Sequence, residues 1–591
     1  MKRWLNYAKP YWIYFIVGPL CMITEVIGEI ALPALYAKIV DVGVANHDVR
    51  YIAITCALMI LTALLMMFGG VGGAYFASKA SVNFAADVRR DVYAKIQKFS
   101  FANIDHFSTG SLVTRLTNDV TQIMNIINMI MRMCLRAPGM LIGALIMSIL
   151  MNPNLATVLA VTIPLLLVVV ITVIRIGFHR FSRMQSKVDG LNNKIQEDLT
   201  NVRVIKSFVR EDYEKERFAE ANGDLRATAM SALNVMIAMM PIMMLLMNFT
   251  VLAVIWFGGN QVIGGTMAVG DLTAFINYVN QILMSLMMLT MVFLNSSRAL
   301  ASARRISEVL DEKIDLTDEN AARRDLDVTR GDVEFRNVGF RYYKNSDEQV
   351  LQNISLTIRA GETVGVIGST GCGKTTLVSM IPRLYDVDEG EVLVDGANVK
   401  DYSLKHLREG VGMVLQKNVL FSGTIEENLR WGDEDASDAE IRAAARSAQA
   451  DEFIERFPEG YESGLDQGGT NVSGGQKQRL CIARALLKKP KILILDDSTS
   501  AVDTATEARI RSAFTNELKD STKIIIAQRI SSVRDADQII VLDEGRITGV
   551  GTHDELLRSN REYQEIYESQ ESGRESVLAE AAAPADGREG D

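Results

Sequence analysis

The sequence has little of what marks a disulfide-rich or a nucleic-acid-binding protein. Five cysteines in 591 residues show no paired or metal-binding spacing, so no disulfide framework is expected, and a reducing cytosol suits the two in the second half. A formal net charge of −10 argues against a nucleic-acid binder, which normally presents a basic face. The length exceeds one globular core and predicts two or more domains. The cysteines are Cys21, Cys56, Cys134, Cys372 and Cys481.

A cleavable signal peptide is also missing. The first residues, MKRWLNYAKPYW, are basic and aromatic, and the apolar stretch that follows is too long for the core of a signal peptide. We predict an interfacial elbow helix over 1–12 that leads into a membrane span, with Trp4, Tyr11 and Trp12 at the level of the lipid headgroups.

Long apolar runs fill the first half of the chain. Crossing the bilayer core takes about 20 apolar residues, and six stretches meet that need. We therefore predict a six-helix transmembrane domain over 13–310, with the spans extended as helices into the cytosol. The six stretches lie near 13–41, 52–78, 122–150, 154–178, 228–258 and 271–297.

Lys and Arg are almost absent from one set of connections between these stretches. The connections at about 79–121 and 179–227 carry many of them, whereas the three opposite ones carry only Arg50. Because excess positive charge marks the cytosolic side, we expect a multi-pass protein of the cytoplasmic (inner) membrane with both termini in the cytosol. The tips of the two cytosolic extensions are predicted near Phe101–Phe107 and Arg210–Phe218.

Four charged residues lie inside the predicted spans. Glu25 and Glu29 are four residues apart, as are Arg132 and Arg136, so each pair is expected on one helix face. Charges in a membrane are costly and often functional. Two interpretations stay open: the groups pair with one another and hold helices together, or they contact a substrate or act in gating.

The second half contains a phosphate-binding pattern. A strand-like stretch, ETVGVIG, runs into GSTGCGKTT, which matches G-x-x-x-x-G-K-[ST]. The glycines let backbone N–H groups approach the phosphates of ATP. Lys374 would neutralise the β- and γ-phosphates, and Thr375 would offer its hydroxyl to Mg²⁺. The predicted ATP-binding residues here are Gly368, Ser369, Thr370, Gly371, Cys372, Gly373, Lys374, Thr375 and Thr376.

A second motif follows downstream. The stretch NVSGGQKQRLCIARALLKKPKILILDD places S-G-G-Q about twenty residues before a strand that ends at Asp496. With it, nearly the whole chain resembles the ABC transporters, specifically the bacterial half-size exporters of the multidrug and lipid-flippase type. The resemblance implies an α/β P-loop nucleotide-binding domain over 333–568, after a linker at 311–332. The remaining tail, 569–591, is acidic and is expected to be disordered.

The resemblance assigns further roles. Tyr342 resembles the aromatic residue that stacks on adenine, with Tyr343 as the alternative. Gln416, in MVLQKNVLF, resembles the glutamine that touches Mg²⁺ and senses the membrane domain, and Asp503 belongs to a stretch like the loop that crosses between two such domains. The implied Mg²⁺ ligands are Thr375, Gln416 and Asp496, and the implied signature residues are Ser473, Gly474, Gly475 and Gln476.

Two residues depart from the family pattern. Where the family has a glutamate that acts as base for the attacking water, this chain has Asp497, whose carboxylate is shorter by roughly 1–1.5 Å of reach; a misplacement of about 1 Å can cost about a hundredfold in rate. Where the family has a histidine at the γ-phosphate, this chain has Gln528, which cannot become a cation or relay a proton. The departures predict a site that binds ATP and cleaves it slowly.

The family's geometry implies a non-identical partner. Two nucleotide-binding domains enclose two ATP molecules head to tail, so the departures at Asp497 and Gln528 affect one site only. The signature, intact apart from Val472 in place of a usual leucine, would complete a competent site on a partner that carries glutamate and histidine. This chain then resembles the degenerate-site subunit of a heterodimeric exporter; the alternative is a homodimer that cycles slowly.

Substrate and coupling stay open at the level of sequence. The resemblance implies alternating access driven by ATP and Mg²⁺, with a hydrophobic or amphipathic small molecule as the preferred substrate. Lipids and peptides are alternatives, although no peptidase domain precedes the first span. An ATP-gated regulatory membrane protein is a further alternative. An importer is disfavoured, because the six spans are fused to the ATPase.

Overall fold

The described residues of the computed structural model form two compact units. They cover 2–319, 321–344, 348–497 and 504–570. The first unit comprises Met1–Gln97 and Thr109–Glu312, and the second comprises Lys98–Ser108 and Lys313–Asp591. The short segment Lys98–Ser108 therefore packs with the second unit although it is embedded in the sequence of the first.

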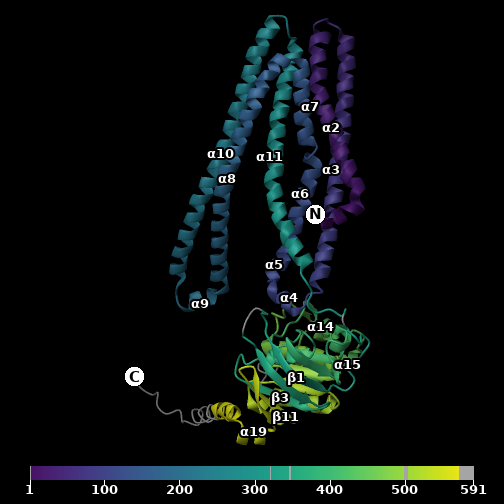
Figure 1. Ribbon diagram of the computed structural model, residues 1–591, viewed down its shortest axis with the longest axis vertical. Helices are drawn as coiled ribbons and strands as arrows, with labels where there is room; N and C mark the ends of the chain where they lie inside the picture. The colour runs from purple at the N-terminus through teal and green to yellow at the C-terminus, as the bar shows by residue number, and fades with distance from the viewer. Residues whose placement is uncertain (1, 320, 345–347, 498–503, 571–591) are drawn as a thin grey trace. The chain divides into compact units, whose positions relative to one another are not determined.

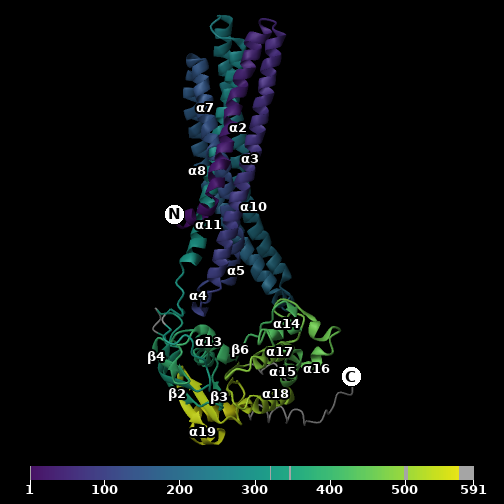
Figure 2. The ribbon, with the colours of Figure 1, turned by 90° about the vertical axis from the view of Figure 1, so that its right-hand side faces the viewer.

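The first unit consists of long helices (Figure 1). Helices α2 and α3 pack side by side (Figure 2), as do α8 and α10, while α11 packs on α2, α6 and α7. Their bounds are α1 Lys2–Ala8, a 3₁₀ turn Lys9–Tyr11, α2 Trp12–Lys38, a π-helix Ile39–Val44, α3 Val49–Ile96, α5 Thr109–Thr114, a π-helix Arg115–Asp119, α6 Val120–Met133, α7 Arg136–Met151, α8 Pro153–Thr200, α9 Val202–Ser207, α10 Glu211–Ile263 and α11 Val269–Asp311.

The predicted membrane spans fall on these helices. Among the described residues, five stretches are long and apolar enough to cross a membrane, and the fourth predicted span, 154–178, begins in the apolar part of α8, Pro153–Val169. The five are Arg3–Val44, Val49–Ile96, Thr109–Met151, Glu211–Ile263 and Val269–Val292. Together with the second unit described below, they confirm the predicted fold class: a helical transmembrane domain followed by an α/β nucleotide-binding domain.

Polar side chains fix where several long helices begin. The Asp48 carboxylate accepts the Tyr51 N–H at 3.0 Å at the start of α3, and Asn152 caps α8 just ahead of Pro153. Such caps satisfy backbone donors that have no partner in the first helical turn. At the start of α11 the cap comes from far away in sequence, because Asp41 accepts the N–H groups of Gly270 and Asp271 at 2.6 and 3.0 Å.

The first predicted cytosolic tip is a short helix of the second unit. Helix α4, Phe101–His106, begins with a capping box in which Ser100 and Asn103 bond reciprocally. Its Asn103 side chain also donates to the carbonyl of Lys313 at 2.9 Å, and Asp105 accepts the hydroxyl of Tyr385 at 2.9 Å. Phe101 packs against the Tyr385 ring, so α4 is held by hydrogen bonds and an aromatic contact.

The second tip lies earlier than predicted. The chain reverses through α9 and the turn at 208–210, and the predicted range Arg210–Phe218 falls instead on the end of that turn and the first turns of α10. Here Val209 has a left-handed φ of 52°, and the Arg210 N–H bonds back to the carbonyl of Ile205. The first turn of α10 is acidic, with Glu211, Asp212 and Glu214, which suits the positive N-terminal end of a helix rather than a reversal of the chain.

The second unit contains an antiparallel sheet, a mainly parallel sheet and a small two-stranded ribbon. The first has the strand order β2-β1-β4-β5 and the second β12-β11-β3-β10-β9-β6, while β7 pairs with β8. The strands are β1 Val333–Phe340, β2 Leu351–Ile358, β3 Thr363–Gly368, β4 Glu389–Val394, β5 Ala397–Asn398, β6 Val411–Val414, β7 Gly423–Thr424, β8 Gly464–Leu465, β9 Ile492–Asp496, β10 Thr522–Ile526, β11 Gln538–Asp543 and β12 Arg546–Gly551.

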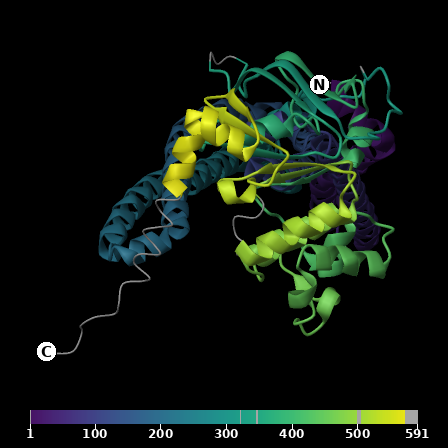
Figure 3. The ribbon, with the colours of Figure 1, turned by 90° about the horizontal axis from the view of Figure 1, so that it is seen from below.

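Helices cover the parallel sheet. Strands β9 and β10 are buried along their whole length, as expected for parallel strands covered on both faces. Figure 3 shows the green to yellow-green helices of this unit grouped beside the strands. The helices are α12 Lys374–Ser379, α13 Leu404–Gly410, α14 Ile425–Arg430, α15 Asp438–Ser447, α16 Asp451–Ile454, α17 Gly474–Leu487, α18 Thr504–Glu517 and α19 His553–Ser559, with 3₁₀ turns at Gly460–Glu462 and Ile530–Ser532; a further helix covers 561–570.

Candidate functional site

The candidate ATP site lies at the carboxyl edge of the parallel sheet. Strands β3, β10, β9 and β6 are neighbours in that order and run parallel. In such sheets, ligands bind in the crevice beyond the carboxyl ends of the strands. Besides the loop after β3, the side chains at that edge are Gln528 after β10, Asp496 and Asp497 at the end of β9, and Gln416 after β6.

The loop between β3 and α12 has the backbone of a phosphate-binding loop. Gly368 has a φ of 155°, and a Cβ there would lie 1.9 Å from the carbonyl oxygen of Leu542, so no side chain fits. Gly373 has a φ of 100° and directly precedes α12. The Lys374 ammonium donates to the carbonyls of Gly368 and Ser369 at 2.9 and 2.7 Å, which holds the cation against the loop.

The rest of the loop is open at its tip and buried at its base. Ser369, Thr370 and Gly371 are exposed, and a Cβ on Gly371 would meet no atom within 4 Å. Cys372 and Gly373 are buried. A rigid base under an exposed row of backbone N–H groups is the arrangement that phosphate binding requires.

Tyr342 lies beside the helix that follows this loop. Its hydroxyl is 2.9 Å from the hydroxyl of Thr376, and its ring packs edge-to-face on Tyr385 at 5.3 Å between centroids. Tyr342 is 43% exposed and Tyr343 79% exposed. These contacts favour Tyr342 over Tyr343 as the adenine-stacking residue.

Asp496 and Thr375 have the donor set that Mg²⁺ prefers. Asp496 is buried, its Oδ1 accepts the Thr375 hydroxyl at 3.0 Å, and its Oδ2 is buried with no hydrogen-bond partner among the described residues. Burial raises the pKa of the Asp496 carboxyl, and neighbouring Asp497 adds to that rise. A buried carboxylate oxygen without a donor, next to a hydroxyl, fits a hard divalent cation. Asp496 and Thr375 would hold it together with Gln416.

Asp497 accepts hydrogen bonds from neutral amides, and Gln528 Nε2 donates to its Oδ2 at 2.8 Å. Burial raises the pKa of the Asp497 carboxyl, while the hydrogen bonds from Gln528 and Gln416 and the charges of Lys374 and Arg529 lower it. The backbone of Asp497 is left-handed, with a φ of 48°, and its carbonyl accepts Gln478 Nε2 at 3.4 Å. The carboxylate is therefore oriented, but none of these amides can accept its proton.

The signature residues lie at the start of α17. The Ser473 hydroxyl accepts the Gln476 N–H at 3.3 Å, and Gln476 Oε1 accepts the Ser473 N–H at 2.9 Å, which completes a capping box. Ser473 and Gly474 are exposed. A fourteen-residue helix thus presents its positive end to solvent, a ready site for phosphate. Within the described part of this unit, no hydrogen bond links residues 473–476 to the phosphate loop.

Some site residues were not found from sequence, and one prediction cannot be located. Gln478, 1% exposed, contacts the Asp497 carbonyl; its place one turn into the helix after S-G-G-Q was the available signal. Gln570 contacts the backbone of Gln528 from 42 residues downstream, and no motif marks it. Asp503 lies outside the described residues.

The charged residues of the first unit are only partly brought together. Arg136 Nη2 lies 3.2 Å from Glu25 Oε1 and 2.6 Å from Glu29 Oε1. Gln281 Nε2 donates to the backbone carbonyl of Glu29 at 2.8 Å. The prediction that Arg132 and Arg136 share one helix face is wrong, because α6 ends at Met133 and α7 begins at Arg136; Arg132 is exposed.

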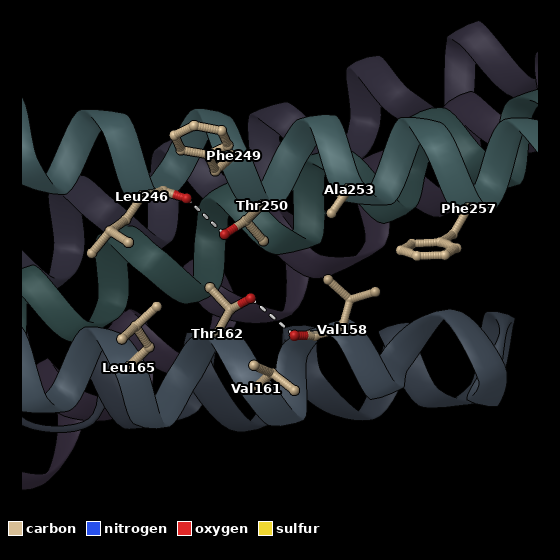
Figure 4. Close-up of a pocket in the computed structure, with 9 residues that line it drawn as sticks. All are labelled: Val158, Val161, Thr162, Leu165, Leu246, Phe249, Thr250, Ala253 and Phe257. Carbon is tan, nitrogen blue, oxygen red and sulfur yellow. Dashed lines mark hydrogen bonds between the residues drawn. The ribbon is translucent and has the colours of Figure 1, made fainter.

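An apolar cavity lies between α8 and α10 (Figure 4). Its volume is about 300 Å³. The hydroxyls of Thr162 and Thr250 donate to the carbonyls of Val158 and Leu246 on their own helices, so their protons are already engaged. The cavity is lined by Val158, Val161, Thr162, Leu165, Leu246, Phe249, Thr250, Ala253 and Phe257.

Comparisons with known proteins agree with both units. Residues 15–286 match the ABC transporter transmembrane region, and residues 351–500 match the ABC transporter family. The chain is 41% identical over 575 residues to an uncharacterised ABC transporter ATP-binding protein of Bacillus subtilis, YfiB, covering 97% of this chain and 99% of that protein. It is 33% identical to an ATP-dependent lipid A-core flippase of Syntrophus aciditrophicus, covering 96% and 94%.

A solved structure has the same architecture. The structure of a bacterial Atm1-family ABC exporter with ATP bound superposes with a TM-score of 0.76 at 29% sequence identity, covering 97% of this chain and 99% of that one. The similarity includes both units of the chain.

Proposed function

This chain belongs to the ABC transporter family, as an exporter-type chain with a transmembrane region and an ATP-hydrolysing domain, and on that premise we propose that its own nucleotide site binds ATP and cleaves it slowly. Fast hydrolysis is then supplied by a second, non-identical half-transporter. The chain is the degenerate-site subunit of a heterodimeric exporter.

The observation that carries this proposal is the contact between Gln528 and Asp497. The 2.8 Å hydrogen bond joins the two positions at which the chain departs from the family pattern. An effective general base must reach the attacking water and have a pKa tuned to the task. The Asp497 carboxylate is short, and the Gln528 amide that orients it carries no charge and cannot relay a proton. ATP is therefore held in place while the cleavage step is slow.

The signature supports a role for this chain in a partner's site. Ser473 to Gln476 form an exposed helix N-terminus that bonds to no residue of this chain's own phosphate loop within the described part. Such an end attracts phosphate. A partner with glutamate and histidine at the positions of Asp497 and Gln528 would pair its own complete catalytic residues with this intact signature.

The transported molecule is proposed to be a hydrophobic or amphipathic small molecule, moved outward by alternating access. Two observations support this class: a relative is named a lipid A-core flippase, and the cavity between α8 and α10 has an apolar lining. Both termini are placed in the cytosol on the basis of the Lys and Arg distribution. Arg136 and the two glutamates are proposed to hold helices together, since Arg136 bridges both carboxylates.

ATP turnover of the purified full-length chain tests the proposal. In lipid nanodiscs without any partner, the chain should bind Mg-ATP yet hydrolyse far less than one ATP per second. Adding a companion half-transporter with glutamate and histidine at the matching positions should raise turnover of the pair. Turnover of several per second by the chain alone, abolished by Asp497→Asn, would show that it is a working homodimer.

A further inference from the structure

The last described residue of the chain, Gln570, contacts the backbone next to Gln528. Its Nε2 donates to the Gln528 carbonyl at 2.8 Å, and its Oε1 accepts the Ile530 N–H at 2.9 Å. We infer that Gln570 is a positioning residue for the nucleotide site, which holds the segment 528–530 so that the Gln528 side chain meets Asp497. This inference rests on the proposed role of Gln528 beside the γ-phosphate.

The two hydrogen bonds copy the pairing of a neighbouring β-strand. In an extended chain, the carbonyl of one residue and the N–H of the residue two positions later point to the same side, and a neighbouring strand bonds both. Arg529, between the two bonded residues, is extended, with φ −104° and ψ 131°. The side-chain amide of Gln570 therefore bonds the backbone just beyond the end of β10, at Ile526, in the way that a neighbouring strand would.

Ile530 is buried in the core, but the two residues before it have few other constraints. The Gln528 and Arg529 side chains are exposed, and the Ile530 N–H begins a 3₁₀ turn, where a donor has no partner within the turn itself. A glutamine side chain also has considerable rotamer freedom to lose when it is fixed. Holding the backbone on both sides of Arg529 restricts the positions that the Gln528 side-chain amide can reach. This restriction favours its hydrogen bond to Asp497.

The helix that carries Gln570 is itself anchored. In helix 561–570, Tyr563 is completely buried, its hydroxyl lies 2.8 Å from His553 Nδ1, and its N–H donates to Asn560 Oδ1 at 2.7 Å. Ile566 and Tyr567 pack against the core that contains Ile530 and Val533. Gln570 therefore holds 528–530 from a helix that is itself packed against the core.

A double-mutant cycle in the full-length chain tests the inference. Steady-state ATP hydrolysis in nanodiscs is measured for the unaltered chain, Gln570→Ala, Gln528→Ala and the double variant. Loss of two neutral hydrogen bonds predicts about a fivefold lower kcat for Gln570→Ala, with KM for ATP within twofold. Because Gln570 acts through the Gln528 side chain, the same substitution should have less than a twofold effect in the Gln528→Ala background. Equal losses in both backgrounds, or no loss in either, would overturn the inference.

Two further variants separate positioning from folding. Gln564→Ala is the matched control, because Gln564 lies on the same helix and donates to the Leu557 carbonyl at 2.7 Å, away from 528–530; its kcat should be unchanged. Gln570→Glu keeps the acceptor for the Ile530 N–H and loses the donor to Gln528, so its kcat should fall between those of Gln570→Ala and the unaltered chain. A Gln564→Ala loss as large as that of Gln570→Ala would overturn the inference. High ATP turnover of the unaltered chain alone would refute the proposed function. The ratios of kcat between the variants and the unaltered chain would still test the role of Gln570.

Discussion

The nucleotide site and the cavity in the membrane unit are built on opposite principles. At the edge of the parallel sheet, polar groups meet at fixed distances: Lys374 on loop carbonyls, Thr375 on Asp496, and Gln528 on Asp497. Between α8 and α10, the two hydroxyls are satisfied by their own helices and the rest of the lining is apolar. The first region can bind a ligand through directional bonds, whereas the second can offer a ligand mainly shape and apolar surface.

The largest expected effect concerns the charged cluster of the membrane unit. Replacing Arg136 by Met leaves Glu25 and Glu29 together without their cation. Removing one partner of a fully buried ion pair costs about 3–5 kcal/mol, which is the upper limit for these partly buried side chains. We expect a loss of several degrees in thermal unfolding in detergent. Arg132→Met, at an exposed position, is the matched control and should unfold like the unaltered chain. An unchanged unfolding temperature for Arg136→Met would contradict structural pairing and favour a role in contact with substrate.

The next largest effect should come from the phosphate loop. Lys374→Ala removes the cation held against the loop, and loss of charge-assisted hydrogen bonds of about 3 kcal/mol corresponds to roughly a hundredfold weaker ATP binding. Equilibrium binding of a fluorescent ATP analogue measures it. Lys489→Ala, which removes a surface ion pair with Glu440, should bind ATP normally. Equal affinities for Lys374→Ala and the unaltered chain would remove the phosphate loop from the proposed site.

A smaller effect is expected from restoring the length of the catalytic acid. Asp497→Glu adds one methylene and should raise ATP hydrolysis of the heterodimer by about tenfold, because about 1 Å of reach at a reacting group strongly affects rate. Adding Gln528→His should raise it further. Asp497→Asn is the control that keeps the size and removes the charge. If both the rate of ATP hydrolysis and its coupling to transport stayed the same in Asp497→Glu, hydrolysis at this site would not limit the rate of the transport cycle.

The smallest effect should come from the apolar cavity. Ala253→Phe places a ring in a space of about 300 Å³ and should lower transport of the bulkiest substrates by about threefold, with ATP binding unchanged. Thr250→Val should alter transport by less than twofold, since that hydroxyl bonds only its own helix. Vesicle uptake of a size series of amphipathic dyes measures both. Equal transport of large and small dyes by Ala253→Phe would exclude this cavity from the substrate path.

The same contrast explains what could be predicted from the sequence. Phosphate binding needs particular residue types at fixed spacing, so the loop from Gly368 to Thr376 and the strand end at Asp496 could be located before the structure was known. The apolar cavity needs only volume, which many apolar side chains supply, and its lining has no spacing to detect. Gln570 was missed for another reason: its partners are 40 and 42 residues away, and a single amide leaves no pattern.

Local errors came from helix ends. The four-residue spacing of Arg132 and Arg136 suggested one face, but the spacing argument holds only within a continuous helix, and the break at 134–135 separates them. The second tip was predicted at 210–218, whereas the chain reverses just before the start of α10. Periodicity locates helices well, whereas turns between them depend on a few backbone angles such as that of Val209.

The position of residues 98–108 has a practical consequence for cutting the chain. A fragment that began at Lys313 would retain every nucleotide motif, yet it would leave the Tyr385 hydroxyl and the Lys313 carbonyl without Asp105 and Asn103. The nucleotide-binding unit is therefore not one continuous segment of the sequence. Swapping this ATPase onto another transporter's membrane helices would require transplanting the eleven-residue loop as well, or redesigning the surface on which it rests.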